Sequence, residues 1–138
     1  MTLDIEDTKK NHITLKKFYH EDIKQKILTR IFRPGNRECP DEKCYFGTQK
    51  VFIKILDITG SDYHKIEPIH LPQKYPVEII SSKCLKLKDL KKSDFKNCGS
   101  DLKNIETLKS HLGLIYNLDK NIFNDKNFEI TITDFKYL

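Results

Sequence analysis

The sequence predicts a single α+β domain, built as a small β-barrel or curved mixed sheet with two or three helices at its edges. The chain has 138 residues, and a domain of that length buries roughly two-thirds of its unfolded surface. The expected strands are grouped, whereas a doubly wound parallel sheet needs strands and helices to alternate. We therefore expect one domain over residues 13–138, preceded by a polar tail over residues 1–12.

Hydrophobic spacing defines the expected elements of the first half of the chain. Leu15, Tyr19 and Ile23 recur at helical spacing, whereas Val51 and Ile53 alternate with less apolar neighbours as in a strand. Three prolines between residues 64 and 76 favour an irregular connection there. The resulting expectations are a helix over 13–26, strands over 28–32 and 45–58, and a turn at 34–36.

The second half of the chain is expected to hold short strands, then helices, then a closing strand. Asn104 is a favourable N-cap, and Ile105, Leu108 and Leu112 follow it at helical spacing. The expected elements are strands over 77–80 and 85–87, a short helix over 89–97 with Gly99 just beyond its end, a helix over 105–116, and a half-buried strand over 128–138.

The net charge of +5 is unevenly distributed along the chain. Residues 9–37 hold nine basic and two acidic side chains, a local charge of +7, whereas the rest of the chain sums to −2. Arg30, Arg33 and Arg37 fall within eight residues, and arginine is suited to bidentate phosphate contact. A second basic run over 83–96 holds six lysines against two aspartates and is equally typical of a solvated face. The first segment favours a polyanionic partner.

Four cysteines are present without an apolar leader, so we expect thiols in a reducing cytosol. The Cys39–Cys44 spacing is tolerated in a zinc knuckle, whereas Cys84 and Cys98 are separated by thirteen residues and form no such knuckle. We expect no metal and no cofactor. Apolar runs fall far short of the roughly 20 residues that a bilayer requires. These features predict a cytoplasmic monomer with no membrane partner.

The order of the motifs resembles a known family. A basic segment over 22–33 follows the first helix, a strand covers 50–56, and a run over 87–99 begins with leucine and ends with glycine. A helix ending at Tyr116 and a terminal strand complete the pattern. This arrangement resembles the ASCH domains, small members of the PUA-like β-barrel superfamily. The resemblance implies a PUA-like barrel that binds RNA or modified nucleosides in a cleft beside the first helix.

The family signature is Gly-x-Lys-x-x-Glu-x-Arg, with a Lys-x-x-Thr variant in small amidohydrolases that deacylate a modified cytidine. Lys26 and Thr29 keep the Lys-x-x-Thr spacing, but Lys24 stands at the glycine position and Ile31 at the arginine position. The resemblance implies an enzyme with Lys26 as base and Thr29 as nucleophile only if this alignment holds.

A second alignment and the lack of a glutamate at the expected position weaken the enzymatic interpretation. Aligned on Arg33, the signature places Leu28 at the lysine position and Ile31 at the threonine position. The catalytic glutamate of the family is expected near 91–94, where the chain has two lysines and no glutamate. A lysine there cannot take up a proton while a hydroxyl attacks, so the departures disfavour catalysis.

We therefore expect a non-catalytic RNA-binding module, with association with the ribosome or another ribonucleoprotein as one form of that function. The alternatives are an N4-acylcytidine-type amidohydrolase and a protein-interaction adaptor stabilised by zinc. Cations are expected to hold phosphates while aromatic side chains stack on bases. The expected RNA-binding residues are Lys24, Lys26, Thr29, Arg30, Arg33, Arg37 and Tyr45.

Overall fold

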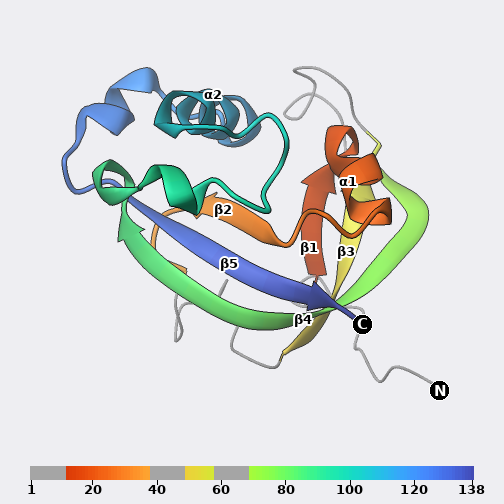
Figure 1. The fold of residues 1–138 in the computed structure, drawn as a ribbon. Helices are drawn as coiled ribbons and strands as arrows, with labels where there is room; N and C mark the ends of the chain where they lie inside the picture. Colours follow the sequence, from red (N-terminus) through yellow and green to blue (C-terminus); the bar gives the residue numbers. More distant parts are fainter. Residues whose placement is uncertain (1–11, 38–48, 58–68) are drawn as a thin grey trace.

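Five strands form one curled mixed sheet in the computed structural model, which describes residues 12–37, 49–57 and 69–138 (Figure 1). The spatial order is β1-β3-β4-β5-β2; β1 runs parallel to β3, and the other pairs are antiparallel. The curved mixed sheet of the sequence-based expectation is therefore confirmed. The strands are β1 (His12–Lys16), β2 (Arg30–Pro34), β3 (Lys50–Leu56), β4 (His70–Lys86) and β5 (Glu129–Tyr137).

Two α-helices and several 3-10 turns flank the sheet in the described part of the chain. The Asn104 side chain accepts a hydrogen bond from the Thr107 amide at 2.9 Å and thereby caps the helix that was expected over 105–116. No helix in the described ranges is long and apolar enough to span a bilayer. The helices are α1 (His20–Lys24) and α2 (Ile105–Tyr116); the 3-10 turns are η1 (Lys17–Tyr19), η3 (Leu87–Asp89), η4 (Lys92–Asp94) and η5 (Lys120–Asn124).

Strand β4 gives the sheet its curl because it belongs to both halves. Its first part pairs with β3, and its second part pairs with β5. The register shifts once in each ladder, between Lys54 and Leu56 on β3 and between Ile79 and Ser81 on β4. Such irregularities bend a strand and increase its twist. The sheet therefore closes into a half-barrel whose edge strands are β1 and β2.

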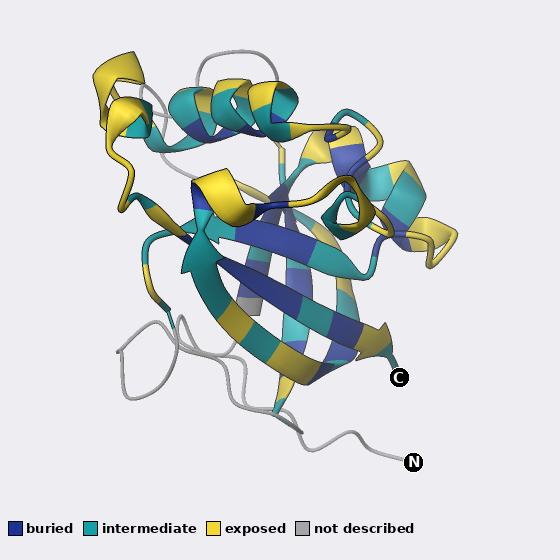
Figure 2. Cartoon of the chain, turned by 60° about the vertical axis from the view of Figure 1, so that its left-hand side comes forward, coloured by how far each residue is buried: buried dark blue, intermediate teal, exposed yellow. Residues whose placement is uncertain are grey.

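In the described part of the chain the buried apolar side chains form two core clusters, to which neighbouring residues of β2 contribute. Figure 2 shows buried segments along the strands of the sheet. Ile31 belongs to the first cluster, which packs β1, β3 and β4 against Ile23 of α1. Phe32 belongs to the second cluster, which packs β5 against Leu108 and Leu112 of α2. Consecutive residues of β2 thus face different cores, as the alternation of a strand requires.

The predicted helix over 13–26 is wrong for its first half. Residues 12–16 form β1, parallel to β3, and only His20–Lys24 is α-helical after a 3-10 turn. Ile13 and Leu15 satisfy the two-residue period of a strand, and both are buried against the sheet; of the two, Leu15 also falls on the expected helical stripe. Phe18, which the helical stripe also used, is 61% exposed.

The expected irregular connection over 64–76 is also wrong where the structure describes it. From His70 onward the chain belongs to β4 and contains two prolines. Pro72 lies at the register shift, where three residues of β4 are opposite one residue of β3. Its lack of a backbone N–H therefore does not cost the sheet a hydrogen bond. The strands expected at 77–80 and 85–87 are confirmed as one continuous strand.

The expected short helix over 89–97 is replaced by η3 and η4, and the expected strand boundaries shift by a few residues. Gly99 was expected just beyond the end of that helix, a place where the backbone commonly becomes left-handed. In the structure Asn97, with φ of 58°, has the left-handed conformation instead. The strand expected over 28–32 is β2 at Arg30–Pro34, and the strand at 45–58 is β3 within the described range. The closing strand is confirmed, but its threonines are buried as well, since both faces of β5 are covered.

Candidate functional site

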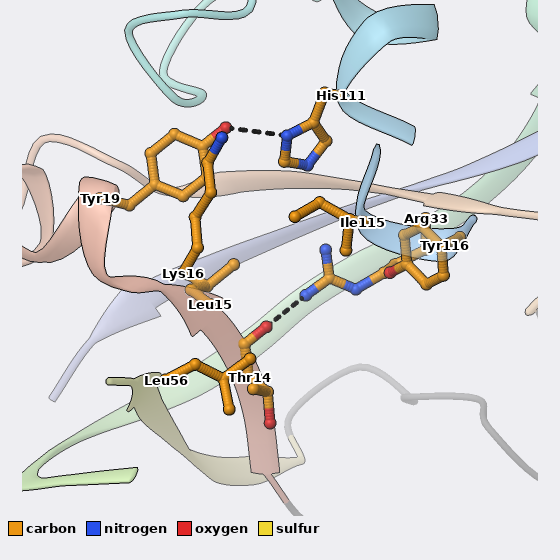
Figure 3. A pocket seen from close by; sticks show the side chains of 9 residues that line it. All are labelled: Thr14, Leu15, Lys16, Tyr19, Arg33, Leu56, His111, Ile115 and Tyr116. Atoms are coloured by element: carbon orange, nitrogen blue, oxygen red, sulfur yellow. Dashed lines mark hydrogen bonds between the residues drawn. The ribbon is translucent and has the colours of Figure 1, made fainter. Parts of the chain in front are cut away.

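A small cavity lies where the two edge strands of the half-barrel approach the C-terminal half of α2 (Figure 3). Its volume is about 40 Å³, room for roughly three water molecules. Strand β1, the end of η1, β2, the end of β3 and α2 all contribute to its wall. The lining residues are Thr14, Leu15, Lys16, Tyr19, Arg33, Leu56, His111, Ile115 and Tyr116.

Arg33 of β2 bridges the two edges of the sheet. Its guanidinium donates to the Thr14 carbonyl of β1 at 3.0 Å (Figure 3). It also donates to the Phe32 carbonyl at 3.2 Å. Both partners are neutral, and no ion pair to Arg33 occurs within residues 12–37, 49–57 and 69–138. The positive charge in the cavity wall is therefore not neutralised by a carboxylate of the described chain.

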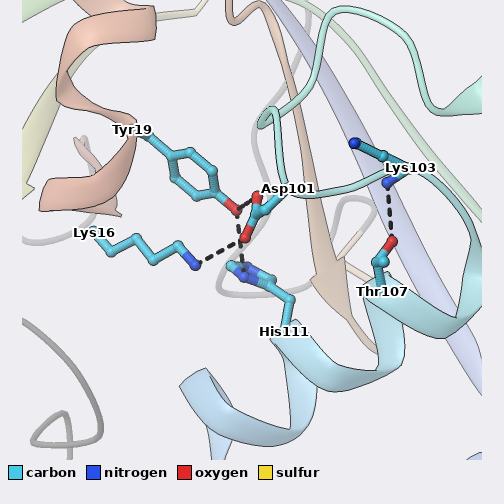
Figure 4. Close-up of polar contacts among 6 residues, drawn as sticks. All are labelled: Lys16, Tyr19, Asp101, Lys103, Thr107 and His111. Atoms are coloured by element: carbon cyan, nitrogen blue, oxygen red, sulfur yellow. Dashed lines mark hydrogen bonds and ion pairs between the residues drawn. The ribbon is translucent and has the colours of Figure 1, made fainter.

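Lys16, Tyr19 and Asp101 form a hydrogen-bonded group beside Arg33 (Figure 4). The Lys16 ammonium contacts Asp101 Oδ2 at 3.1 Å, and Tyr19 Oη donates to Asp101 Oδ1 at 2.6 Å. Burial opposes ionisation of Asp101, but the hydrogen bonds from Tyr19 and Lys16 outweigh burial and lower its pKa. Burial, followed by the bond to Asp101, raises the pKa of Tyr19. At neutral pH this group is an ammonium, a carboxylate and a protonated phenol.

His111 of α2 completes the polar wall of the cavity. Burial, with the charges of Lys16 and Arg33, lowers its pKa to about 4, so the imidazole is neutral at pH 7. Its Nδ1 lies 3.4 Å from Tyr19 Oη, whose own proton points to Asp101. The favoured tautomer thus carries its proton on Nδ1 and leaves Nε2 as an acceptor. Asp101 acts in the opposite direction on the His111 pKa, but its effect is smaller than that of either cation.

Aromatic rings border the cavity on two sides. The Lys16 ammonium lies 5.2 Å from the ring centre of Phe18 and 4.8 Å from that of Tyr19, and the Phe18 ring is exposed. On the other side, the Arg37 guanidinium lies 5.6 Å from the ring centre of Tyr116. Lys16 and Arg37 therefore each combine a positive charge with an accessible aromatic surface.

The expectation that the three arginines share one face is wrong for Arg30. Its guanidinium pairs with Asp134 of β5 through Nε at 2.7 Å and Nη2 at 3.0 Å, and Nη1 donates to the Asp94 carbonyl. The hydrogen bond to Asp134 raises the pKa of Arg30. Arg30 and Arg33 are three residues apart on one strand, so their side chains leave opposite faces of the sheet. Arg30 acts within the fold, away from the cavity.

The remaining predicted RNA-binding residues divide into two groups. Lys24 and Lys26 are exposed at the end of α1 and just beyond it, and Thr29 lies in the loop before β2, where its amide donates to the Asn97 carbonyl. Lys24, Lys26 and Thr29 are all absent from the lining of the cavity. Tyr45 lies outside the described residues.

The cysteines show no metal site in the described part of the chain. Cys84 donates to Glu129 on the neighbouring strand, and Cys98 donates to the Leu102 carbonyl. No group of three or more potential ligands occurs in residues 12–37, 49–57 and 69–138. Cys39 and Cys44 lie outside these ranges.

Comparison with known proteins adds no family to this geometry. Family models, curated proteins and solved structures gave no match. The arguments that follow therefore rest on the residues and contacts of this chain.

Most of the polar wall was not expected from the sequence. Lys16, Tyr19, Asp101 and His111 were not among the predicted site residues, and the contacts that join them to one another span 82 to 92 residues of sequence. One signal was available for Asp101, since it follows Gly99 in a polar stretch between apolar runs, but nothing local links it to Tyr19.

Proposed function

We propose that this protein binds single-stranded RNA, with one backbone phosphate held by Arg33 and Lys16 in the cavity between the sheet edges. The observation that carries the proposal is the Arg33 guanidinium, which lines the cavity with only carbonyl oxygens as partners in the described chain. An arginine in that state retains its charge for an anionic oxygen.

The small size and polar wall of the cavity suit a phosphate group. A volume of about 40 Å³ accommodates a few water-sized groups, and the Arg33 and Lys16 cations in its wall attract anionic oxygens. The bases would then lie outside the cavity, where the exposed Phe18 ring and the Tyr116 ring offer stacking surfaces. Cations that hold the backbone beside aromatic rings are typical of single-strand binding.

The backbone at Lys26 supports a PUA-like, ASCH-type reading of this site. Lys26 has φ of 59°, in the left-handed region that favours glycine. When the ASCH signature Gly-x-Lys-x-x-Glu-x-Arg is aligned on Arg33, its glycine falls on Lys26. In that alignment the signature arginine is Arg33, the residue in the cavity. The lysine and glutamate positions are then Leu28 and Ile31, which favours binding without catalysis.

The direct test is the affinity for a fluorescent octauridylate at several salt concentrations. We expect Arg33→Ala to weaken binding about tenfold and to reduce the slope of log affinity against log salt by about 0.7, the effect of one lost phosphate contact. Arg33→Lys should recover part of the affinity, since it restores the charge without the planar fork. Lys126→Ala is the matched control, because Lys126 is exposed and lines neither cavity.

Two outcomes would contradict the proposal. One is the absence of measurable binding by the unaltered protein at low salt. The other is an equal loss of affinity in Arg33→Ala and Lys126→Ala, because that result would indicate general attraction to a basic protein rather than a defined site. Capture of RNA or a ribonucleoprotein from lysate, abolished by nuclease, would identify the natural form of the partner.

A further inference from the structure

A second, larger hollow lies between η4 and the start of α2. Its volume is about 440 Å³, and it is open to solvent. Leu90, Phe95 and Ile105 give it an apolar floor, and three lysines stand around it. We call it the lysine groove; its lining residues are Leu90, Lys91, Lys92, Phe95, Lys103, Asn104, Ile105 and Glu106.

The floor of the lysine groove contains the end of an aromatic stack. The Phe95 ring lies on the Phe32 ring, with centres 5.4 Å apart and planes inclined by 27°. Phe32 is buried in the core, whereas Phe95 is partly exposed and lines the groove. A planar occupant placed on the open side of Phe95 would extend this stack into solvent.

The rim of the groove is positively charged. Lys91, Lys92 and Lys103 are all exposed, and none of them forms an ion pair within the described ranges. The one carboxylate of the rim, Glu106, is 82% exposed and already lies 3.5 Å from Lys109. The rim therefore favours an anionic occupant, and the floor favours one that carries a flat ring.

We infer that the lysine groove binds a nucleotide unit of the same RNA strand, with its base on Phe95 and its phosphates near Lys92 and Lys103. This inference rests on the proposed function. The groove is lined at the start of α2 by Asn104, Ile105 and Glu106, and the phosphate cavity is lined near the end of α2 by His111, Ile115 and Tyr116. The centres of these two sets are about nine residues apart, which corresponds to about 13 Å along the helix. A short strand covers that distance, within the site sizes of about 4–16 nucleotides of comparable single-strand binders.

The test compares octauridylate with an abasic octamer that keeps the sugar-phosphate backbone. For the unaltered protein, removal of the bases should weaken binding at least tenfold, since each stacked base contributes substantially. Phe95→Leu should weaken binding of octauridylate about fivefold and leave binding of the abasic octamer unchanged. Phe123→Leu is the matched control, because Phe123 packs against the same core cluster and lines neither the cavity nor the groove.

A double variant, in which Lys92 and Lys103 are both replaced, provides a second test if Phe95→Leu fails to fold. Lys92→Ser and Lys103→Ser together remove two exposed charges, so the fold should survive, and the salt slope should fall by up to about 1.4.

The outcomes separate this inference from the proposed function. If Arg33→Ala weakens RNA binding while Phe95→Leu and the double lysine variant do not, the groove is not an RNA subsite and the phosphate cavity stands. If the protein binds no RNA, both proposals fail. If an octaglutamate peptide binds the groove as tightly as octauridylate does, the groove takes an acidic protein segment and the base-stacking assignment is overturned.

Discussion

The ring of Tyr19 lies directly against the backbone of Gly99, so the loop before α2 is held onto η1 without any side chain between them. A Cβ at Gly99 would lie 2.6 Å from Tyr19 Cζ and 2.8 Å from Tyr19 Oη, closer than real Cβ contacts allow. This approach brings Asp101, two residues further on, within hydrogen-bond distance of Tyr19 Oη. The glycine is therefore what allows the polar wall of the cavity to form.

Replacement of Gly99 by alanine should destabilise the protein by about 1–3 kcal/mol, because the Tyr19 ring is buried and cannot move aside without strain. Gly113→Ala is the matched control. It lies in α2, where an added Cβ meets only the Leu118 carbonyl at an ordinary 3.8 Å, and alanine favours the helix by about 1 kcal/mol. Urea denaturation should show opposite signs for the two variants. Equal stability of Gly99→Ala and the unaltered protein would contradict the close approach.

Arg30 and Arg33 should separate stability from binding. Arg30→Gln breaks a two-point contact with Asp134, whose side chain is 29% exposed, and should lower the free energy of unfolding by about 1–2 kcal/mol. Its effect on the RNA salt slope should be near zero, whereas Arg33→Ala should reduce that slope. Chemical denaturation and a salt titration of the same samples measure both quantities. If Arg30→Gln reduced the slope of log affinity against log salt as much as Arg33→Ala does, Arg30 would have to contact RNA, and its assignment to the fold would be wrong.

The strongest local patterns predicted their elements well. Asn104 before an apolar helical stripe identifies α2, and the alternation after Phe128 identifies β5. The pattern around residues 13–19 is ambiguous, because Leu15 lies four residues before Tyr19, as in a helix, and also two residues after Ile13, as in a strand. Only the parallel pairing with β3, nearly 40 residues away, selects the strand.

The charge pattern located one part of the site and misplaced another. The run of arginines correctly drew attention to Arg33. It also predicted Arg30 as a binding residue, but closeness in sequence does not place the two side chains on the same face of the sheet. The expected strand over 28–32 ended one residue before Arg33; only the observed strand, Arg30–Pro34, contains both arginines, and residues an odd number of positions apart on a strand face opposite sides. Asp101 and His111 could not be predicted, because they reach Tyr19 only after the sheet curls and α2 packs on it.

The stability of the protein should depend on His111 between about pH 6.5 and pH 4. In that interval the unfolded chain holds a proton on this imidazole and the folded chain, with a pKa of about 4, does not, so stability falls as pH falls. The loss should reach up to about 3 kcal/mol for the full shift. Asp101, with a lowered pKa, adds its own loss only below about pH 3.8. In urea titrations His111→Gln should flatten the pH 4–6.5 interval, and an unchanged pH dependence in this variant would contradict the assignment.

Binding of RNA should take up a proton at His111. In the free protein, burial and the charges of Lys16 and Arg33 hold the imidazole neutral, with its Nε2 as an acceptor that disfavours a phosphate oxygen. A bound phosphate offsets the two cations and stabilises the imidazolium, which then donates to the anion, so the His111 pKa rises in the complex. Octauridylate affinity should therefore increase about tenfold from pH 7.5 to pH 5.5, an interval in which RNA phosphodiesters and uracil do not titrate. His111→Gln should remove the increase while retaining most of the affinity at pH 7.5. An increase of the same size in His111→Gln would show that the linked proton lies elsewhere and that His111 does not face the phosphate.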